Sequence, residues 1–410
     1  MAGASYVLPI RCGADGPPDD LTGYLGRLAA ALDVVVVDGS DPDVFAANAR
    51  RWDGLPIRHV PPGPDVRCAN GKVAGVLTGV RLAAHDRVVI ADDDVRYDDA
   101  ALRRTVELLD RADLVRPQNY FAPLPWHATW DTARSLLNRL TGGDYPGTLA
   151  VRRSLLLATG GYDGDVLFEN LELIRTVRAA GGRIVTPLDL FVARRPPSTD
   201  RFWSQRVRQA YDDFAQPPRL ALALGAVPAL GRAVVRSGDA GQALRRLTAV
   251  AGTLVVAAEL GRCRAGGRAV FPFSASLLAP AWVVERGVCS WLALASRLRH
   301  GGCPYAGRII VRAANPPRRL HRRYGGLAST RRSLPGQDQE SPAETGEVAR
   351  GAPEGGVVKG PRAEAANEFD VKAVAVEQLL HAAEGGGVEE GRHAPAVEGP
   401  PVQRAGAAER

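Results

Sequence analysis

Hydrophobic positions in residues 1–195 alternate between two periods. Continuous apolar runs, of the kind that form buried strands, occur at 7–10, 34–37, 88–91 and 114–115. The stretches between them repeat apolar residues at helical spacing, over 21–32, 43–52, 70–84 and 100–110. A turn and a helix over 163–182 and a short strand from 184 continue the pattern. This alternation predicts an α/β fold, with a mainly parallel sheet and helices on both faces.

A different pattern begins after Pro218. Ala, Leu and Val dominate 220–235, 247–260 and 271–298, and charge or proline interrupts each stretch. None is a clean run of ~20 apolar residues, which a spanning helix needs. Two interpretations stay open: interfacial, re-entrant or short transmembrane helices, or a soluble helical subdomain. A basic collar follows, which suits an anionic membrane surface. It consists of arginines 297, 299, 308, 312, 318, 319, 322 and 323.

Composition changes again near residue 330. From there to residue 410 the chain is rich in Gly, Ala, Glu and Pro and poor in large apolar residues, so we expect disorder. The predicted organisation is a catalytic α/β domain over 1–215, apolar membrane-associated helices over 216–325 and a disordered tail over 326–410.

Charge divides the chain in the same way. Its net charge is +7, but residues 333–410 carry fourteen acidic and seven basic side chains, so the remainder is strongly basic. A basic surface suits anionic lipid or phosphorylated substrates, and without a nucleic-acid-binding motif we expect no nucleic-acid partner. The five cysteines form no Cys-x-x-Cys pair, which is typical of reduced cytoplasmic thiols. The first residues resemble no signal peptide.

Three consecutive aspartates follow the apolar run at 88–91. Asp92, Asp93 and Asp94 would lie at the carboxyl end of a buried strand, where open α/β sheets bind ligands. A divalent cation, Mg²⁺ or Mn²⁺, bridged to substrate phosphates would neutralise the cluster. An acidic turn that caps the next helix is the alternative interpretation.

Two other motifs suit phosphate. Asn70-Gly71-Lys72 places a cation and free backbone N–H groups at a helix start. In Gln205-Arg206-Val207-Arg208-Gln209, the guanidinium groups of Arg206 and Arg208 could hold a diphosphate, although a basic face of a surface helix explains them equally well.

Together, these motifs make the chain resemble inverting family-two glycosyltransferases with the GT-A fold, over about residues 4–215. The motifs occur in the order of that family. They are Pro9-Ile10-Arg11, Asp38-Gly39-Ser40, Asn70-Gly71-Lys72, Asp92-Asp93-Asp94, the stretch from Gly147 to Arg153, Gly160-Gly161-Tyr162-Asp163, Phe168-Glu169-Asn170-Leu171-Glu172 and Gln205 to Gln209.

The resemblance implies roles for these residues. Asp38 would accept a hydrogen bond from uracil, Asp92 would contact the sugar or ribose and also the metal, and Asp94 would bind the metal. The other donor-binding candidates are Arg11, Lys72, Asp93, Arg206 and Arg208. The acceptor-binding candidates are Gly147, Asn170 and Gln205.

The chain departs from the family at the catalytic base. The family places an aspartate where this chain has Asn170, and an amide cannot take a proton. Glu169 is the leading candidate for the base. Glu172 is the alternative, although a pairing with Arg175 at i+3 would account for it without a catalytic role. Gln209 also replaces the tryptophan that ends the family's Gln-x-x-Arg-Trp motif.

The predicted function is transfer of a sugar from a nucleotide-sugar, expected to be a UDP-sugar, to a hydroxyl of a lipid-like acceptor at the cell membrane, with the catalytic domain in the cytoplasm. A sugar-phosphate nucleotidylyltransferase shares the strand-end aspartates, but its Gly-rich loop after the first strand is missing here. A membrane scaffold with a degenerate site is the non-enzymatic alternative, motivated by Asn170.

Overall fold

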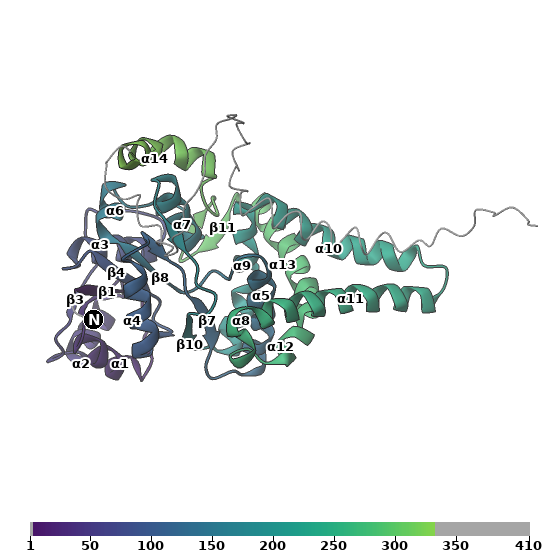
Figure 1. Cartoon of the computed structure of the whole chain (residues 1–410), viewed down its shortest axis with the longest axis horizontal. Helices are drawn as coiled ribbons and strands as arrows, with labels where there is room; N and C mark the ends of the chain where they lie inside the picture. The colour runs from purple at the N-terminus through teal and green to yellow at the C-terminus, as the bar shows by residue number, and fades with distance from the viewer. Residues whose placement is uncertain (1–2, 333–410) are drawn as a thin grey trace, which may run out of the picture.

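The computed structural model describes residues 3–332, and these form an α/β body with a helical extension (Figure 1). The main sheet has seven strands in the order β3-β2-β1-β4-β8-β6-β9. In chain order these are β1 (Ala4–Ile10), β2 (Asp33–Asp38), β3 (Arg58–Val60), β4 (Arg87–Ala91), β6 (Leu114–Val115), β8 (Thr148–Arg152) and β9 (Ile184–Val185). The α/β fold class predicted from the sequence is confirmed.

The sheet is mixed in direction. β1 is parallel to β2 and β4, β2 to β3, and β6 to β9. β8 is the exception, because it lies antiparallel between β4 and β6. The stretch from Gly147 to Arg153 was expected only as a motif, because a short apolar run reveals neither a strand nor its direction.

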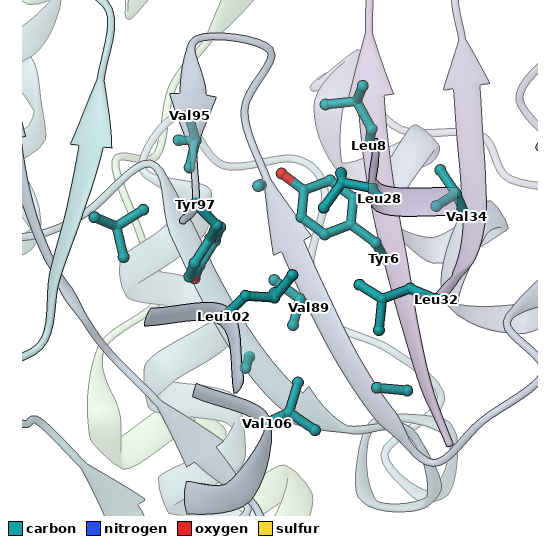
Figure 2. Packing of buried hydrophobic residues seen from close by; sticks show 14 of the residues in the cluster. Tyr6, Leu8, Leu28, Leu32, Val34, Val89, Val95, Tyr97, Leu102 and Val106 are labelled. Carbon is teal, nitrogen blue, oxygen red and sulfur yellow. The ribbon is translucent and has the colours of Figure 1, made fainter. Parts of the chain in front are cut away.

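Helices cover both faces of the sheet, as the alternating pattern predicted. One core contains side chains of α1 (Leu21–Ala29) and α4 (Asp99–Leu108), and Figure 2 shows Tyr6 and Tyr97 within it. The opposite core contains side chains of α3 (Gly71–Leu82), α6 (Arg153–Ala158), α7 (Glu169–Ala179) and α14 (Pro317–Arg332). α2 (Pro42–Arg51) connects β2 to β3.

A second sheet lies beside the carboxyl end of β4. Its order is β5-β10-β7, with β5 (Val95–Arg96), β7 (Gln118–Phe121) and β10 (Phe191–Arg194). β10 runs parallel to β7 and antiparallel to β5, so the chain after the three aspartates pairs with a strand about 100 residues later. This pairing brings Arg194 next to the aspartates.

The stretches after Pro218 form a helical extension. α10 (Pro217–Val235) and α11 (Ala240–Cys263) are an antiparallel pair that projects from the body in Figure 1. α11 returns to the long helix α5 (Trp126–Thr141), where a Cβ on Gly261 would overlap the backbone of Leu136. The remaining helices here are α8 (Thr199–Ser204), α9 (Arg206–Tyr211), α12 (Phe273–Leu277), α13 (Ala279–His300) and the 3₁₀ turns η1 (Asp212–Ala215) and η2 (Arg264–Ala269).

The chain then returns to the α/β body. A hairpin of β11 (Cys303–Tyr305) and β12 (Arg308–Ile310) precedes α14, whose Leu320 and Tyr324 are buried against the core under α7. Residues 326–332, which were predicted to belong to the tail, are therefore part of a packed helix. The tail begins later than predicted. The rest of the predicted tail lies outside the described residues.

Candidate functional site

The three aspartates lie in the turn between β4 and β5, and their carboxylates have different partners. Asp92 Oδ1 lies 2.5 Å from Lys72 Nζ, and Asp94 Oδ2 accepts a hydrogen bond from Arg194 Nε at 2.9 Å. Asp93 lines a separate cleft. Burial raises the pKa of Asp93, and the charge of Asp92 raises it further.

Lys72 joins the two halves of the predicted site. Lys72 is the second residue of α3. The Asn70 side chain caps the first turn of this helix by accepting a hydrogen bond from the Lys72 N–H. Its ammonium group also lies 2.6 Å from Glu169 Oε1, so it bridges Glu169 and Asp92. Burial opposes the charge, but the two carboxylates outweigh it and raise the pKa of Lys72 above its usual value. The sequence-based grouping of these three residues at one site is therefore consistent with the structure.

Arg194 is a second cation at this site, and sequence reasoning missed it. Besides Asp94, it lies 3.5 Å from Asp92 Oδ2. Its burial opposes its charge, yet Asp94 and Asp92 raise its pKa above the usual range. The available signal was an arginine at the end of a short apolar stretch, which is too common to indicate a site.

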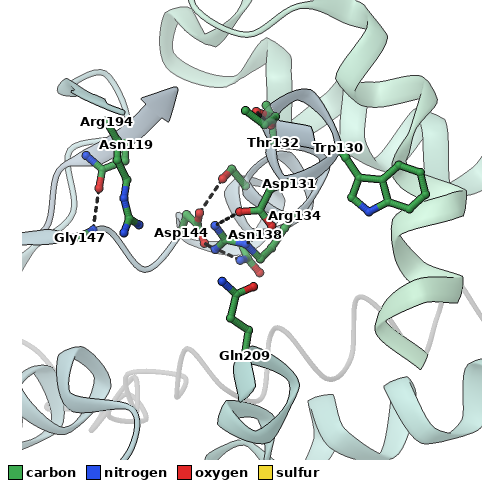
Figure 3. Close-up of polar contacts among 12 residues, drawn as sticks. Asn119, Trp130, Asp131, Thr132, Arg134, Asn138, Asp144, Gly147, Arg194 and Gln209 are labelled. Atoms are coloured by element: carbon green, nitrogen blue, oxygen red, sulfur yellow. Dashed lines mark hydrogen bonds and ion pairs between the residues drawn. The ribbon is translucent and has the colours of Figure 1, made fainter. Parts of the chain in front are cut away.

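Gly147 fixes the approach of β8 to the aspartates. Its carbonyl accepts a hydrogen bond from the Asp92 N–H at 2.8 Å, and its own N–H donates to Asn119 Oδ1 at 2.7 Å (Figure 3). A Cβ at this position would lie 2.8 Å from Asp92 Oδ2 and 3.3 Å from Arg194 Cζ. Glycine is therefore required for this close approach.

The aspartates fit a divalent cation in one respect. Asp94 Oδ1 is buried and has no hydrogen-bond partner, which is costly for a carboxylate oxygen unless a ligand covers it. Burial raises the pKa of Asp94, and the Arg194 charge opposes that rise. No group of three or more His, Cys, Asp or Glu side chains that could hold a metal occurs within residues 3–332.

A cleft of about 330 Å³ opens beside Asp93. The loop after β1 forms most of its wall. The charged residues that line it are Arg11, Arg201, Asp15, Asp19 and Asp93. Two donor-binding candidates, Arg11 and Asp93, therefore share one cavity. Arg11 is largely exposed and lies 3.7 Å from Asp41.

Asp38 is buried, with 1% of its surface exposed, and its oxygens already accept hydrogen bonds from the protein. The donors are Ser40 N at 2.9 Å, Asn48 Nδ2 at 2.8 Å and His59 Nε2 at 3.2 Å. Burial opposes ionisation, but these hydrogen bonds, led by that of His59, lower the pKa of Asp38 to about 2. Ser40 Oγ in turn accepts from the N–H of Cys12, which lines the cleft. The Asp38 carboxylate therefore supports the cleft wall through Ser40 and Cys12.

The acceptor motif lies in the first turn of α7. Glu169 is held by Lys72, and the Asn170 amide donates to Pro146 O at 3.0 Å. Glu172 is fully buried and accepts from the N–H and Nδ2 of Asn315 at 2.7 and 2.8 Å. Glu172 therefore anchors the segment before α14, and its expected pairing with Arg175 is not its main contact.

The arginines of the motif from Gln205 to Gln209 contact residues other than the three strand-end aspartates. Arg206 is only 2% exposed and forms ion pairs with Asp131 at 2.7 Å and with Glu285. Its guanidinium thus ties α9 to α5 and α13, which differs from the predicted diphosphate contact. Arg208 lies 5.8 Å from the centre of the Tyr305 ring, and Gln205 separates α8 from α9.

A polar network on α5 surrounds this ion pair. Arg134 contacts Asp131 and Asp144, and the two carboxylates raise its pKa against the effect of burial. Ser135 and Asn138 also donate to Asp144 (Figure 3). The network fixes the loop that leads to Gly147 and β8.

Sequence reasoning also missed Asp212 and Tyr305. Tyr305 packs in one hydrophobic cluster with Phe168 and Leu171 of the acceptor motif, and the same cluster contains Tyr211, which precedes Asp212. Asp212 follows the arginine motif directly, but a carboxylate in an Asp-Asp pair gave no signal of its own.

No protein-family model matches the sequence, and no curated protein matches it. Among solved structures, a mannosyltransferase from Pyrobaculum calidifontis in complex with GDP-Man and Mn²⁺ is 18% identical, with a TM-score of 0.40 over 82% of this chain and 88% of that one. Glucosyl-3-phosphoglycerate synthase from Mycobacterium tuberculosis, in complex with Mn²⁺ and UDP-glucose, is 19% identical, with a TM-score of 0.36 over 51% and 77%. At TM-scores below 0.5 these likenesses carry no assignment, and the function is argued from the site.

Proposed function

We propose that the chain is a glycosyltransferase that uses a nucleotide-sugar, expected to be a UDP-sugar. The observation that carries this proposal is the Lys72 bridge, because one cation joins a carboxylate of the strand-end aspartates to a carboxylate of the acceptor motif. Donor phosphates and an acceptor hydroxyl have to meet at such a point. The family resemblance of the motifs in residues 4–215 supports the same reaction.

The donor would lie along the carboxyl ends of β1 and β4. Lys72 and Arg194 supply positive charge for the diphosphate, and the cleft with Arg11 and Asp93 would receive the nucleoside. In this arrangement Asp38 shapes the cleft through Ser40 and Cys12. Arg208 remains a candidate for contact with the donor diphosphate. The ion pairs of Arg206 favour a structural role for that residue.

Asp94 and Asp92 are the residues that would hold Mg²⁺ or Mn²⁺. The bare oxygen of Asp94 supports this, since a metal bound by one or two carboxylates completes its coordination with water and phosphate oxygens. When bound, such an ion supplies positive charge that stabilises a nucleoside diphosphate leaving group.

Inversion requires a base for the acceptor hydroxyl. Glu169 remains the candidate from the sequence, but Lys72 holds it in the ligand-free arrangement. Glu172 is unsuited to the role, because Asn315 occupies both of its oxygens.

The proposed acceptor is a lipid-like hydroxyl at a membrane surface, with the catalytic body on the cytoplasmic side. Support comes from the helical extension. α10 is one helix that is long and apolar enough to cross a membrane, and none of its residues is buried. Exposed apolar side chains continue over the neighbouring helices, including Leu244, Val256, Phe273 and Trp291.

A nucleotide-sugar-binding scaffold is the second candidate. It is favoured by Asn170 and by the ion pairs that engage Glu169, Asp92 and Asp94. Such a protein would bind the donor without hydrolysis or transfer.

Thermal unfolding with a panel of nucleotides and nucleotide-sugars, with and without Mn²⁺, tests the proposal. A ligand at about 100 times its Kd stabilises the protein by roughly 2.7 kcal/mol, so a donor should raise Tm clearly. Asp94→Asn should abolish the Mn²⁺-dependent part of the shift. The control is Asp99→Asn, at an exposed surface carboxylate paired with Arg27. Full Mn²⁺-dependent affinity in Asp94→Asn would refute the metal assignment, and binding without turnover would favour the scaffold.

A further inference from the structure

Asp212 is an uncommitted carboxylate beside the acceptor motif. It begins η1, directly after the helix that carries Arg208. Its Oδ1 is buried and has no hydrogen-bond partner within residues 3–332. The residue as a whole is partly exposed.

Charged and titratable groups from several elements act on Asp212. They are Arg208 of α9, Glu169 of α7, Arg286 of α13, Arg134 of α5, Cys303 of β11 and the neighbouring Asp213. Glu169 connects this position to the donor side through Lys72. Tyr305 lies in the same neighbourhood, with Arg208 over its ring. The charges of Glu169, Lys72 and Asp92 also act on the pKa of Tyr305.

The other nearby carboxylates are all committed. Glu169 is held by Lys72 at 2.6 Å, and Glu172 by Asn315. Asp213 pairs with Arg286 at 2.8 Å and with Arg219 at 3.0 Å. These partners already engage the oxygens of the three carboxylates, whereas Asp212 Oδ1 has no hydrogen-bond partner within residues 3–332.

We propose that Asp212 is the general base of the reaction, an inference that rests on the proposed glycosyltransferase function. The Asp212 carboxylate takes the proton of the acceptor hydroxyl as the acceptor oxygen bonds to the anomeric carbon. The bond from that carbon to the diphosphate oxygen breaks, and its electron pair leaves with the nucleoside diphosphate. The proton then passes to solvent.

The electrostatics support this role. Burial raises the pKa of Asp212 to about 7, with the charge of Arg208 opposing the shift and that of Glu169 adding to it. A base with a pKa near the working pH is suited to general base catalysis. Because only the carboxylate form can accept the proton, the rate should rise with pH through about 7.

The same shift has a consequence for stability. The native state binds more protons at Asp212 than the unfolded chain between the ordinary aspartate pKa and about 7, so stability falls as pH rises through that window. Replacing the residue with an uncharged amide should therefore raise Tm above pH 7. A residue with a merely structural role would lower Tm when replaced.

The test compares Asp212→Asn with wild type, Glu169→Gln and Asp213→Asn. The nucleotide-sugar that gives the largest Mn²⁺-dependent rise in Tm serves as donor, and diacylglycerol in mixed micelles, with water as the competing acceptor, receives the sugar. We expect Asp212→Asn to lower kcat by ~10²–10⁴-fold and to remove the rise in rate through pH 7. Its donor affinity should stay within about twofold of wild type and its Tm above pH 7 should increase.

Several results would overturn the inference. They are a wild-type rate and pH profile in Asp212→Asn, a lower Tm above pH 7, and loss of the pH-dependent rise in Glu169→Gln alone. A wild-type protein that binds the donor but neither hydrolyses nor transfers it would also overturn it. Failure to bind any nucleotide-sugar would instead refute the proposed function.

Discussion

The α/β body and the helical extension distribute charge and apolar surface in opposite ways. In the body, Lys72, Asp92 and Glu169 are drawn inward, and their side chains are 14–21% exposed. In the extension, apolar side chains point outward, with Val235 84% and Leu298 78% exposed. An inward charged cluster is typical of a site for a charged ligand, and an outward apolar surface of this extent indicates contact with another apolar phase or partner.

Two helices show the contrast at the level of sequence. α5 has a hydrophobic side that packs on α11 and a polar side that bonds within the protein, including Asp131 and Arg139. α10 has no buried residue, carries Pro228 in its interior, and is apolar over most of its surface. Within residues 3–332, the first helix is largely covered by the protein, and the second is covered only in part, where α13 contacts it.

Arg206 connects the two regions, and its loss should give the largest effect on stability. Arg206→Met leaves Asp131 and Glu285 without their shared cation, and breaking a buried ion pair costs ~3–5 kcal/mol. Arg134 still pairs with Asp131, so we expect the lower end of that range. Urea unfolding measures the loss.

Arg208→Met is the matched control, because Arg208 contacts Tyr305 by a cation–π interaction worth ~0.5–1 kcal/mol. Donor affinity of folded Arg206→Met should equal that of wild type. If Arg206→Met weakens donor binding and leaves stability unchanged, the phosphate role predicted from the sequence is correct and the connecting role is wrong.

The tip of the helical pair, residues 232–246, allows a test of the apolar surface. It exposes Val235 and Leu244 beside four exposed arginines, with Asp239 as its single acidic residue. Burying one such apolar side chain is worth about 1.5–3 kcal/mol. We therefore expect the double variant Val235→Gln, Leu244→Gln to bind anionic vesicles at least ~10-fold more weakly, as measured by sedimentation.

Leu82→Gln, an exposed apolar position in the body, should leave vesicle binding unchanged. Transfer to a water-soluble acceptor should also be the same in the double variant. If wild-type protein stays in the supernatant with anionic vesicles at low salt, the proposed membrane role of the extension is wrong.

Most of the α/β body was predictable because its strands and helices follow local periods. The runs that became β1, β2, β4 and β6 and the helices α1, α3 and α4 were all anticipated. β8, β7 and β10 were not, because their pairing depends on segments far apart in the chain. The β11–β12 hairpin and α14 were missed because the surrounding arginines and glycines suggested a surface collar.

The candidate site was predictable where a motif lies at the end of an element. Asp92, Lys72, Glu169 and Gly147 were named, and they lie together. Arg194 and Asp212 were not named, because tertiary contacts alone bring them to the site. The sequence also could not show that Asp38 and Arg206 are engaged by the protein, since residue type does not reveal burial.

The smallest effect is expected from removing residues 333–410. A stop after Arg332 keeps α14 complete, including Leu320, Tyr324 and Ala328, which are buried in the body. The removed composition, poor in large apolar residues, supplies little surface for a core, so Tm and transfer rate should change by less than the error of measurement. A stop after Pro316 is the informative contrast, because it uncovers the core under α7 and should lower Tm by several degrees. If the stop after Arg332 lowers activity while Tm is kept, the removed residues contribute to acceptor or membrane binding, and the functional surface of the extension reaches further along the chain.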